Sequence, residues 1–158
     1  MSPPIDLEQA HRYFAADCFN RTWTLIEAPE RDAEMNQQML LLSLASLWHW
    51  TQLPDCSDRN LSIGYWLVAR VYALLGQPDN AMRYAEQCQE KSRDQPAFYQ
   101  AYSHEALARA AVVGGDMARG RSHFDQASAL AAQVGDPEEY AALEGDMAAL
   151  RDVLEPSR

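Results

Sequence analysis

The sequence has few cysteines, and they form no recognisable pattern. Cys18, Cys56 and Cys88 are odd in number, widely spaced and free of any Cys-x-x-Cys motif, so neither a disulfide framework nor a zinc ribbon is expected. The N-terminus, "MSPPIDLEQAHR", lacks the apolar segment of a signal peptide. The longest apolar run, residues 39–50, contains three polar side chains and is too short to span a bilayer. These absences predict a cytoplasmic protein with reduced thiols.

Basic charge is also scarce. Thirteen lysines and arginines face 23 aspartates and glutamates, which gives a formal net charge of −10. Residues 125–158 are the most acidic part, with eight acids and two arginines. Such a chain repels phosphate backbones, so nucleic acid is not expected as a partner. The acidic surface is interpreted mainly as a source of solubility.

The motifs of common catalytic and metal sites are missing. The one Gly-Gly pair, in "VVGGD" (112–116), follows an expected helix and not a strand, so it fits a helix end better than a phosphate loop. The segment "HEALA" (104–108) begins like a zinc-protease helix, but Ala108 stands where the second histidine must be. The histidines fall on four different expected helices: His11, His49, His104 and His123. We therefore expect no metal, no cofactor and no enzyme activity.

Valine and isoleucine are sparse while alanine and leucine are abundant, and no long segment alternates with period two. This composition predicts helix throughout. Proline and glycine divide the chain, and Asp6 and Asp136 are suited to cap helix N-termini, the latter followed by Pro137. The expected helices are residues 6–28, 32–53, 57–76, 78–94, 96–114, 116–135 and 136–155.

Two segments of the chain repeat each other. "ARVYALLGQPDNAMRYAEQC" (69–88) aligns with "ARAAVVGGDMARGRSHFDQA" (108–127) at a constant offset of 39 residues. Both copies carry a glycine seven residues after the Ala-Arg pair, at Gly76 and Gly115. Because each glycine follows an apolar helix and precedes a polar restart, we expect both to end a helix with positive φ. The other aligned pairs are Ala81 with Gly120, Ala85 with Phe124, and Cys88 with Ala127.

This spacing of small residues and helix-ending glycines resembles the tetratricopeptide repeat. The resemblance covers about residues 61–132 and includes an aromatic residue at Tyr72, with Ala111 in its place in the second copy. It departs from the family in its period, which exceeds the usual length of about 34 residues, and in the closing proline, which is displaced to Pro96. The N-terminal stretches "HRYFAADCFNRTW" and "SLWHW" are similar to a group of small bacterial helical-repeat proteins, a similarity that implies no activity.

The resemblance implies an all-α fold in which about seven antiparallel helices form a right-handed solenoid. The last helix should act as a cap, since its apolar residues form a single stripe, and a terminal repeat needs a polar outer face. We expect one domain over residues 1–158, built from helix pairs 6–53, 57–94 and 96–135 and a capping helix 136–155. The stripe consists of Tyr140, Leu143, Met147, Leu150 and Leu154.

In tetratricopeptide folds the first helix of each pair lines a concave groove. Carried onto this chain, the resemblance implies a groove for a protein or peptide partner. Two arginines beside aromatic residues would suit an acidic peptide or a carboxylate terminus. The alternative is an internal ion pair, because Glu105 lies one turn before Arg109. The predicted groove residues are Ile63, Trp66, Arg70, Tyr102, Glu105 and Arg109.

The segment Trp48-His49-Trp50 lies in a helix that is apolar nearly all round. The polar residues between Met39 and Trp50 are Ser43, Ser46 and His49, which form one narrow stripe. A helix of this kind is expected to be buried on most sides, as a packed wall. The alternative places the stripe, with Ser46, Trp48, His49 and Trp50, on a groove or on the seam of a homodimer formed through the N-terminal pair.

Together these patterns predict a non-catalytic scaffold that binds a protein or peptide and associates with itself. A sensor that holds a small ligand in a groove lined by tryptophan, histidine and arginine is the alternative from another class, and an enzyme is a more distant one. No membrane partner is expected.

Overall fold

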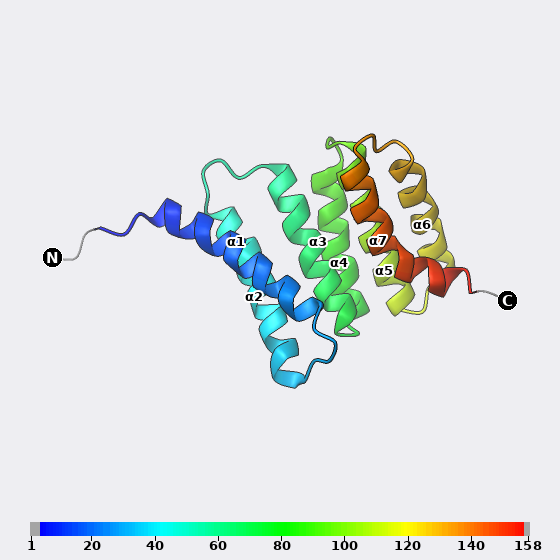
Figure 1. Cartoon of the computed structure of the whole chain (residues 1–158), viewed down its shortest axis with the longest axis horizontal. Coiled ribbons are helices and arrows are strands. Elements are labelled where there is room, and N and C mark those ends of the chain that lie inside the picture. The colour runs from blue at the N-terminus through cyan, green and yellow to red at the C-terminus, as the bar shows by residue number, and fades with distance from the viewer. Residues whose placement is uncertain (1–3, 157–158) are drawn as a thin grey trace.

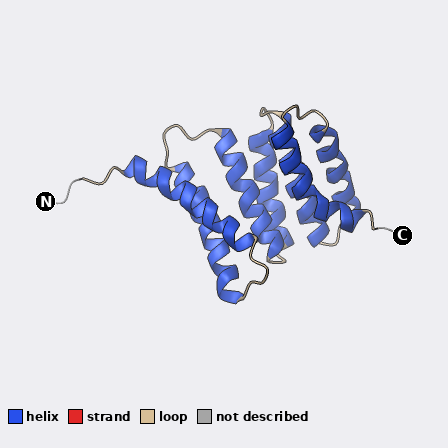
Figure 2. Ribbon diagram, viewed as in Figure 1, coloured by secondary structure: helices blue, strands red, loops and turns tan. Residues whose placement is uncertain are grey.

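The computed structural model describes residues 4–156, and every regular element in that range is a helix (Figures 1 and 2). Seven helices follow one another with short links, as the composition predicted. Their bounds are α1 Leu7–Ile26, α2 Ala33–Thr51, α3 Asp58–Leu74, α4 Pro78–Ser92, α5 Ala97–Val113, α6 Met117–Ala131 and α7 Pro137–Leu154. The prediction of an all-α fold of packed helix pairs is confirmed.

The helices begin where side-chain caps are available. Asp6 accepts a hydrogen bond from the Gln9 backbone at 3.0 Å, and Asp136 accepts from the backbone of the first turn of α7. Asp32, Ser57 and Asp116 cap α2, α3 and α6 in the same way. Each cap satisfies a backbone N–H that has no partner inside its helix. The sequence therefore fixes most helix starts locally.

Gly76 and Gly115 end α3 and α5, and both have positive φ, at 69° and 82°. This confirms the prediction made from the repeat. A Cβ atom at either position would meet no atom within 4 Å. Glycine is needed there for its backbone conformation and not for space.

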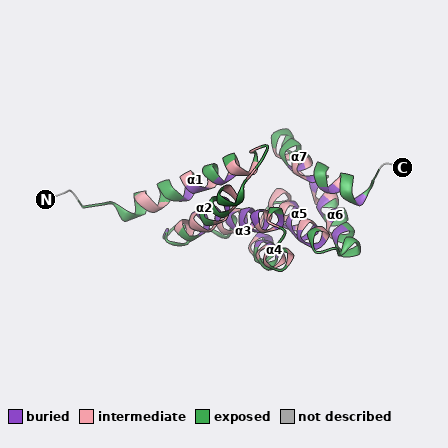
Figure 3. Cartoon of the chain, turned by 90° about the horizontal axis from the view of Figure 1, so that it is seen from below, coloured by how far each residue is buried: buried purple, intermediate pink, exposed green. Residues whose placement is uncertain are grey.

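The helices pack as antiparallel pairs, α1 with α2, α3 with α4 and α5 with α6. Along the chain of pairs, α3 packs against α5, and α5 packs against α7. Figure 3 shows α1 and α7 on two sides of a trough whose floor is formed by α3 and α5; α4 lies below this floor, on the side away from α1 and α7. The first turns of α1 project beyond α2 at the N-terminal end.

The aligned repeat positions occupy equivalent buried places. Ala69 and Ala108 are buried. Both members of two further aligned pairs, Ala85 with Phe124 and Cys88 with Ala127, are also buried. At Gly120 an added Cβ would lie 2.8 Å from Val112 Cγ2, so α5 and α6 approach closely at this point. The small residues thus set the distance between paired helices.

Helix α7 covers the C-terminal end of the stack. Four residues of its predicted apolar stripe, Leu143, Met147, Leu150 and Leu154, are buried against α5 and α6. Tyr140, the fifth, is exposed, because it lies in the first turn, before the helix reaches full contact with its neighbours.

Candidate binding site in the trough

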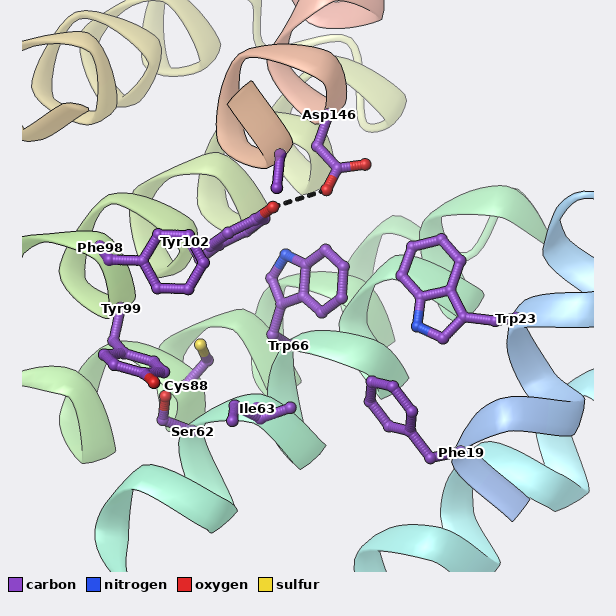
Figure 4. Close-up of a pocket in the computed structure, with 11 residues that line it drawn as sticks. Phe19, Trp23, Ser62, Ile63, Trp66, Cys88, Phe98, Tyr99, Tyr102 and Asp146 are labelled. Atoms are coloured by element: carbon purple, nitrogen blue, oxygen red, sulfur yellow. Dashed lines mark hydrogen bonds between the residues drawn. The ribbon is translucent and has the colours of Figure 1, made fainter. Parts of the chain in front are cut away.

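A cavity of about 350 Å³ opens in the trough, where α1, α3, α5 and α7 meet. Figure 4 shows the aromatic side chains that surround it. Helix α4 reaches it only through Cys88. We call this space the aromatic cavity; its lining residues are Phe19, Trp23, Ser62, Ile63, Trp66, Cys88, Phe98, Tyr99, Tyr102, Ala142 and Asp146.

Aromatic rings form a continuous wall across three helices. Trp23 of α1 stacks against Trp66 of α3, with ring centroids 5.7 Å apart and planes at 29°. Trp66 meets Tyr102 of α5 edge-on at 5.0 Å, and Tyr102 meets Phe98 edge-on at 5.0 Å. These are favourable aromatic geometries, and they fix the rings against one another. The wall is therefore preformed.

A charged network lies behind the aromatic wall and is centred on Glu105. The Glu105 side chain is fully buried, and it accepts a hydrogen bond from Trp66 Nε1 at 2.7 Å and from Arg109 Nε at 2.8 Å. Arg109 also donates to the backbone carbonyl of Asp146 at 3.0 Å. The carboxylate thus orients the Trp66 ring while it neutralises a buried guanidinium.

Asp146 of α7 is the second acid of the network. Its Oδ2 accepts a hydrogen bond from the Tyr102 hydroxyl at 2.8 Å (Figure 4). Its Oδ1 lies 3.3 Å from Arg70 Nη1. Two arginines and two carboxylates are gathered here, so the formal charges of the network cancel.

Arg70 is held mainly by rings and charges. Its guanidinium carbon lies 5.5 Å from the Trp23 ring centroid and 5.7 Å from that of Trp66, distances typical of cation–π contact. Nε and Nη1 are buried and have no hydrogen-bond partner among the described residues. Burial, together with nearby Arg109, lowers the pKa of Arg70.

Two titratable groups on the cavity wall, the Cys88 thiol and the Tyr102 hydroxyl, are kept in their neutral forms. Burial raises the pKa of the Cys88 thiol to about 12. Burial and the neighbouring Asp146 carboxylate raise the pKa of Tyr102. A thiol with such a pKa is a poor nucleophile at neutral pH, because the thiolate is the reactive form.

The structure brings all six predicted groove residues together, but in two layers. Ile63, Trp66 and Tyr102 line the aromatic cavity. The second layer lies behind them, where the arginine side chains are only 15% and 13% exposed. This second layer consists of Arg70, Glu105 and Arg109. The internal ion pair between Glu105 and Arg109, which the sequence left as an alternative, is present, and Arg70 also pairs with Glu105.

Several lining residues were not predicted from the sequence as groove residues. Phe19 and Trp23 come from α1, and Asp146 comes from α7. Both helices lie outside the aligned repeat, so the repeat pattern contains no signal for them. The repeat does contain a signal for the contact between Trp66 and Glu105. These two residues are 39 positions apart, which is the repeat offset, and they share a hydrogen bond.

The residues around Trp48 separate onto different faces of α2. Ser46 is buried and donates to the Ala15 carbonyl of α1 at 2.7 Å, so its side of the stripe packs inward. Small hydroxyl side chains permit this close helix approach, since the hydroxyl is satisfied by a backbone carbonyl. Trp48 is 54% exposed. Trp50 lines a shallow hollow of about 260 Å³ together with Phe19 and Ile63.

The four histidines meet as two pairs. His11 Nδ1 lies 2.8 Å from His49 Nδ1 between α1 and α2, and His104 Nδ1 lies 3.1 Å from His123 Nδ1 between α5 and α6. In each pair one nitrogen donates and the other accepts when both rings are neutral. Over residues 4–156 no three potential metal ligands gather at one place.

None of the described helices combines the length and apolar character needed to cross a bilayer. No protein-family model matches the chain, and comparisons with curated proteins and with solved structures find no match either. The class is therefore defined by the fold and the site themselves: an all-α protein of stacked helix pairs with an aromatic cavity in its trough.

Proposed function

We propose that this protein is a non-catalytic binding module of tetratricopeptide-like type, which holds a segment of a protein partner in its trough. The aromatic cavity carries the proposal: it takes one apolar or aromatic side chain of the partner as an anchor. Preformed apolar pockets with a few fixed polar groups are typical binding sites. Tryptophan and tyrosine are also the residues that most often dominate binding energy at interfaces.

The shape of the surface favours a segment over a compact ligand. The aromatic cavity and the hollow beside Trp50 share Phe19 and Ile63. Apolar surface therefore continues along α1 and α3 beyond the cavity itself. An extended or helical segment would contact both hollows with successive side chains.

The charged network changes the expected chemistry of the partner. From the sequence, Arg70 and Arg109 suited either an acidic ligand or an internal ion pair, and both are paired with acids of this chain. A guanidinium already matched to a carboxylate gains little from a second anion. We therefore assign binding to the aromatic wall and assign the arginines to holding that wall in place.

A small-molecule sensor is the second candidate, because a volume of about 350 Å³ falls at the low end of small-ligand sites. The histidine expected in such a groove is absent from the cavity wall, since His49 lies beside His11 instead. Native mass spectrometry of the protein isolated from its own cells distinguishes the two candidates. A bound metabolite would favour the sensor.

The test of the proposal is selection from a random peptide library displayed on phage. Ala142 is an exposed residue of α7 that lines the aromatic cavity, so Ala142→Trp fills the cavity without entering the core. Ala148→Trp is the matched control, because Ala148 is exposed on α7 and does not line the cavity.

Selected peptides should share an aromatic or large aliphatic residue. They should bind the wild type and Ala148→Trp alike and lose at least tenfold in affinity for Ala142→Trp, which corresponds to about 1.4 kcal/mol. Peptides that bind all three proteins equally would contradict the proposal, as would a library that yields no enrichment.

A further inference from the structure

Large apolar side chains are exposed at the N-terminal end of the molecule. Ile5, Leu7 and Tyr13 are 77%, 67% and 63% exposed, and Phe14 and Trp48 are about half exposed. We call these five residues the N-terminal apolar patch. The other exposed large apolar residues are scattered over α2, α3, α5, α6 and α7.

The patch is continuous across α1 and α2. The ring of Tyr13 meets that of Phe14 edge-on at 5.2 Å, and Phe14 stacks on His49 at 5.6 Å. His11, which pairs with His49, meets Trp48 edge-on at 5.4 Å. Ile5, just before α1, lines a hollow together with Tyr13 and Phe14. Leu7 is the first residue of α1, whose first turns project beyond α2 (Figures 1 and 3).

The two ends of the helix stack differ in how they terminate. At the C-terminal end, α7 turns its apolar stripe inward and covers α5 and α6. At the N-terminal end, no described helix covers α1 and α2 in this way. Repeat proteins need a polar outer face on each terminal unit, because an uncovered stacking face remains apolar. The N-terminal apolar patch is such an uncovered face.

We propose that a second copy of this chain covers the patch, with α1 of each copy packed against α1 of the other about a two-fold axis. A two-fold interface uses the same patch twice, so an apolar face meets an apolar face. The proposal is independent of the aromatic cavity, which opens in the trough between α1 and α7.

The charge distribution favours this arrangement over a head-to-tail one. Helix α1 carries two acids and two arginines, and Arg12 contacts both Glu8 at 3.3 Å and Asp55 at 3.0 Å. Residues 125–158 carry eight acids and two arginines. Pairing of N-terminal ends keeps the two acidic ends apart, whereas head-to-tail stacking would set an acidic, capped end against an apolar one.

The size of the patch is sufficient for a reversible dimer. Side chains of this kind present about 150–250 Å² each when fully exposed, so the partly exposed patch offers roughly 600 Å² per copy. A standard specific interface buries about 800 Å² per partner. The patch is at the low end of this range, so a weak, reversible dimer is expected.

The test is light scattering over a concentration series from 1 to about 200 µM, a range that spans the dissociation constants expected for a small interface. The wild type should shift from 17.8 kDa toward twice that mass. Leu7→Glu with Tyr13→Glu should remain monomeric with an unchanged circular dichroism spectrum, since both side chains are exposed. Val153→Glu, on the exposed side of α7, is the matched control and should dimerise like the wild type.

A wild type that stays monomeric throughout the series would overturn the proposal. A dimer that Val153→Glu disrupts while the double variant does not would also overturn it.

The symmetry has its own test. Spin labels at Gln9→Cys and at Asp152→Cys, each in a Cys56→Ser background, report distances between copies; Cys18 and Cys88 are buried. A two-fold contact through α1 predicts a short distance between the two labels at position 9. The two labels at position 152 should lie too far apart for a distance to be measured. The reverse pattern would contradict it.

Discussion

Glu105 shows how one residue can connect the core of this protein to its candidate site. Three side chains share its buried carboxylate: Trp66 and Arg109 donate hydrogen bonds to it, and Arg70 lies 3.8 Å away. The ring of Trp66 is part of the cavity wall. The orientation of that wall therefore depends on a buried charge that does not itself line the cavity.

Glu105→Gln should destabilise the protein strongly. The substitution removes one negative charge and leaves two guanidinium groups largely buried with a single remaining acid, so a loss of about 3–5 kcal/mol is expected. Glu86→Gln is the control, because Glu86 is exposed and contacts Arg119 at 3.5 Å; such a pair contributes at most about 1 kcal/mol. Urea denaturation measures both, and equal losses would show that the network does not stabilise the fold.

The positive φ of Gly76 leads to a second prediction at this scale. Gly76→Ala should cost about 1 kcal/mol, because a Cβ is disfavoured in this conformation although nothing crowds it. Gly145→Ala is the opposite control. Gly145 lies in the middle of α7 on its exposed side, with no atom near its missing Cβ, so alanine should raise the free energy of unfolding by about 0.5–1 kcal/mol. Thermal denaturation compares the two, and changes of the same sign would contradict this explanation.

At the scale of the element, the sequence predicted most of the fold because the determining signals are local. Caps such as Asp6 and Asp136, and the helix-ending glycines, act within a few residues of themselves. The helix expected over 116–135 ends earlier, at Ala131, since residues 132–135 form the turn that leads to α7.

The candidate site was less predictable, because its contacts join distant helices. The repeat identified Ile63, Trp66 and Tyr102 as neighbours in one groove, and all three line the cavity. It contained nothing about Trp23 or Asp146, whose positions depend on how α1 and α7 cross the trough. The inward packing of Ser46 also has no local signal, since a serine stripe fits a wet groove and a close helix contact equally well.

Helix α7 should be essential for the stability of its neighbours. Met147 is fully buried and packs in the cluster formed by α5, α6 and α7, so Met147→Ala should cost about 2–5 kcal/mol. Val153→Ala, at an exposed position of the same helix, should change stability by less than about 0.5 kcal/mol. If both variants unfold at the wild-type urea concentration, α7 does not act as a cap.

The paired histidines make helix pairing sensitive to pH. Burial and its neighbour His123 lower the pKa of His104, and burial and Arg119 lower the pKa of His123. The unfolded chain therefore binds protons more readily than the folded one, and stability must fall as the pH drops below about 6.5. Burial and His11 likewise lower the pKa of His49, so the α1–α2 pair contributes in the same direction.

The urea midpoint should accordingly be lower at pH 5.5 than at pH 7.5. The variant with His104→Gln and His123→Gln should show a smaller drop, since the glutamine amides do not titrate. An identical drop in the variant would assign the acid sensitivity to other groups.

At the scale of the whole molecule, the trough and the N-terminal apolar patch lie on different surfaces. The trough is bounded by α1 and α7 over the floor of α3 and α5, whereas the patch lies on the outer end of the first pair. Two copies joined through the patch would keep both cavities open. Binding in the trough and self-association can therefore be tested separately. Ala142→Trp should dimerise like the wild type when light scattering measures its mass over the same concentration series.

The most direct test of the central proposal is nuclear magnetic resonance with a peptide selected on the wild type. Titration of the peptide into ¹⁵N-labelled protein should shift the indole N–H signals of Trp23 and Trp66 and the backbone signals near Tyr102 and Asp146. Signals from the far sides of α4 and α6 should stay in place. Shifts confined to α4 and α6, or unchanged indole signals at saturation, would contradict a binding site in the aromatic cavity.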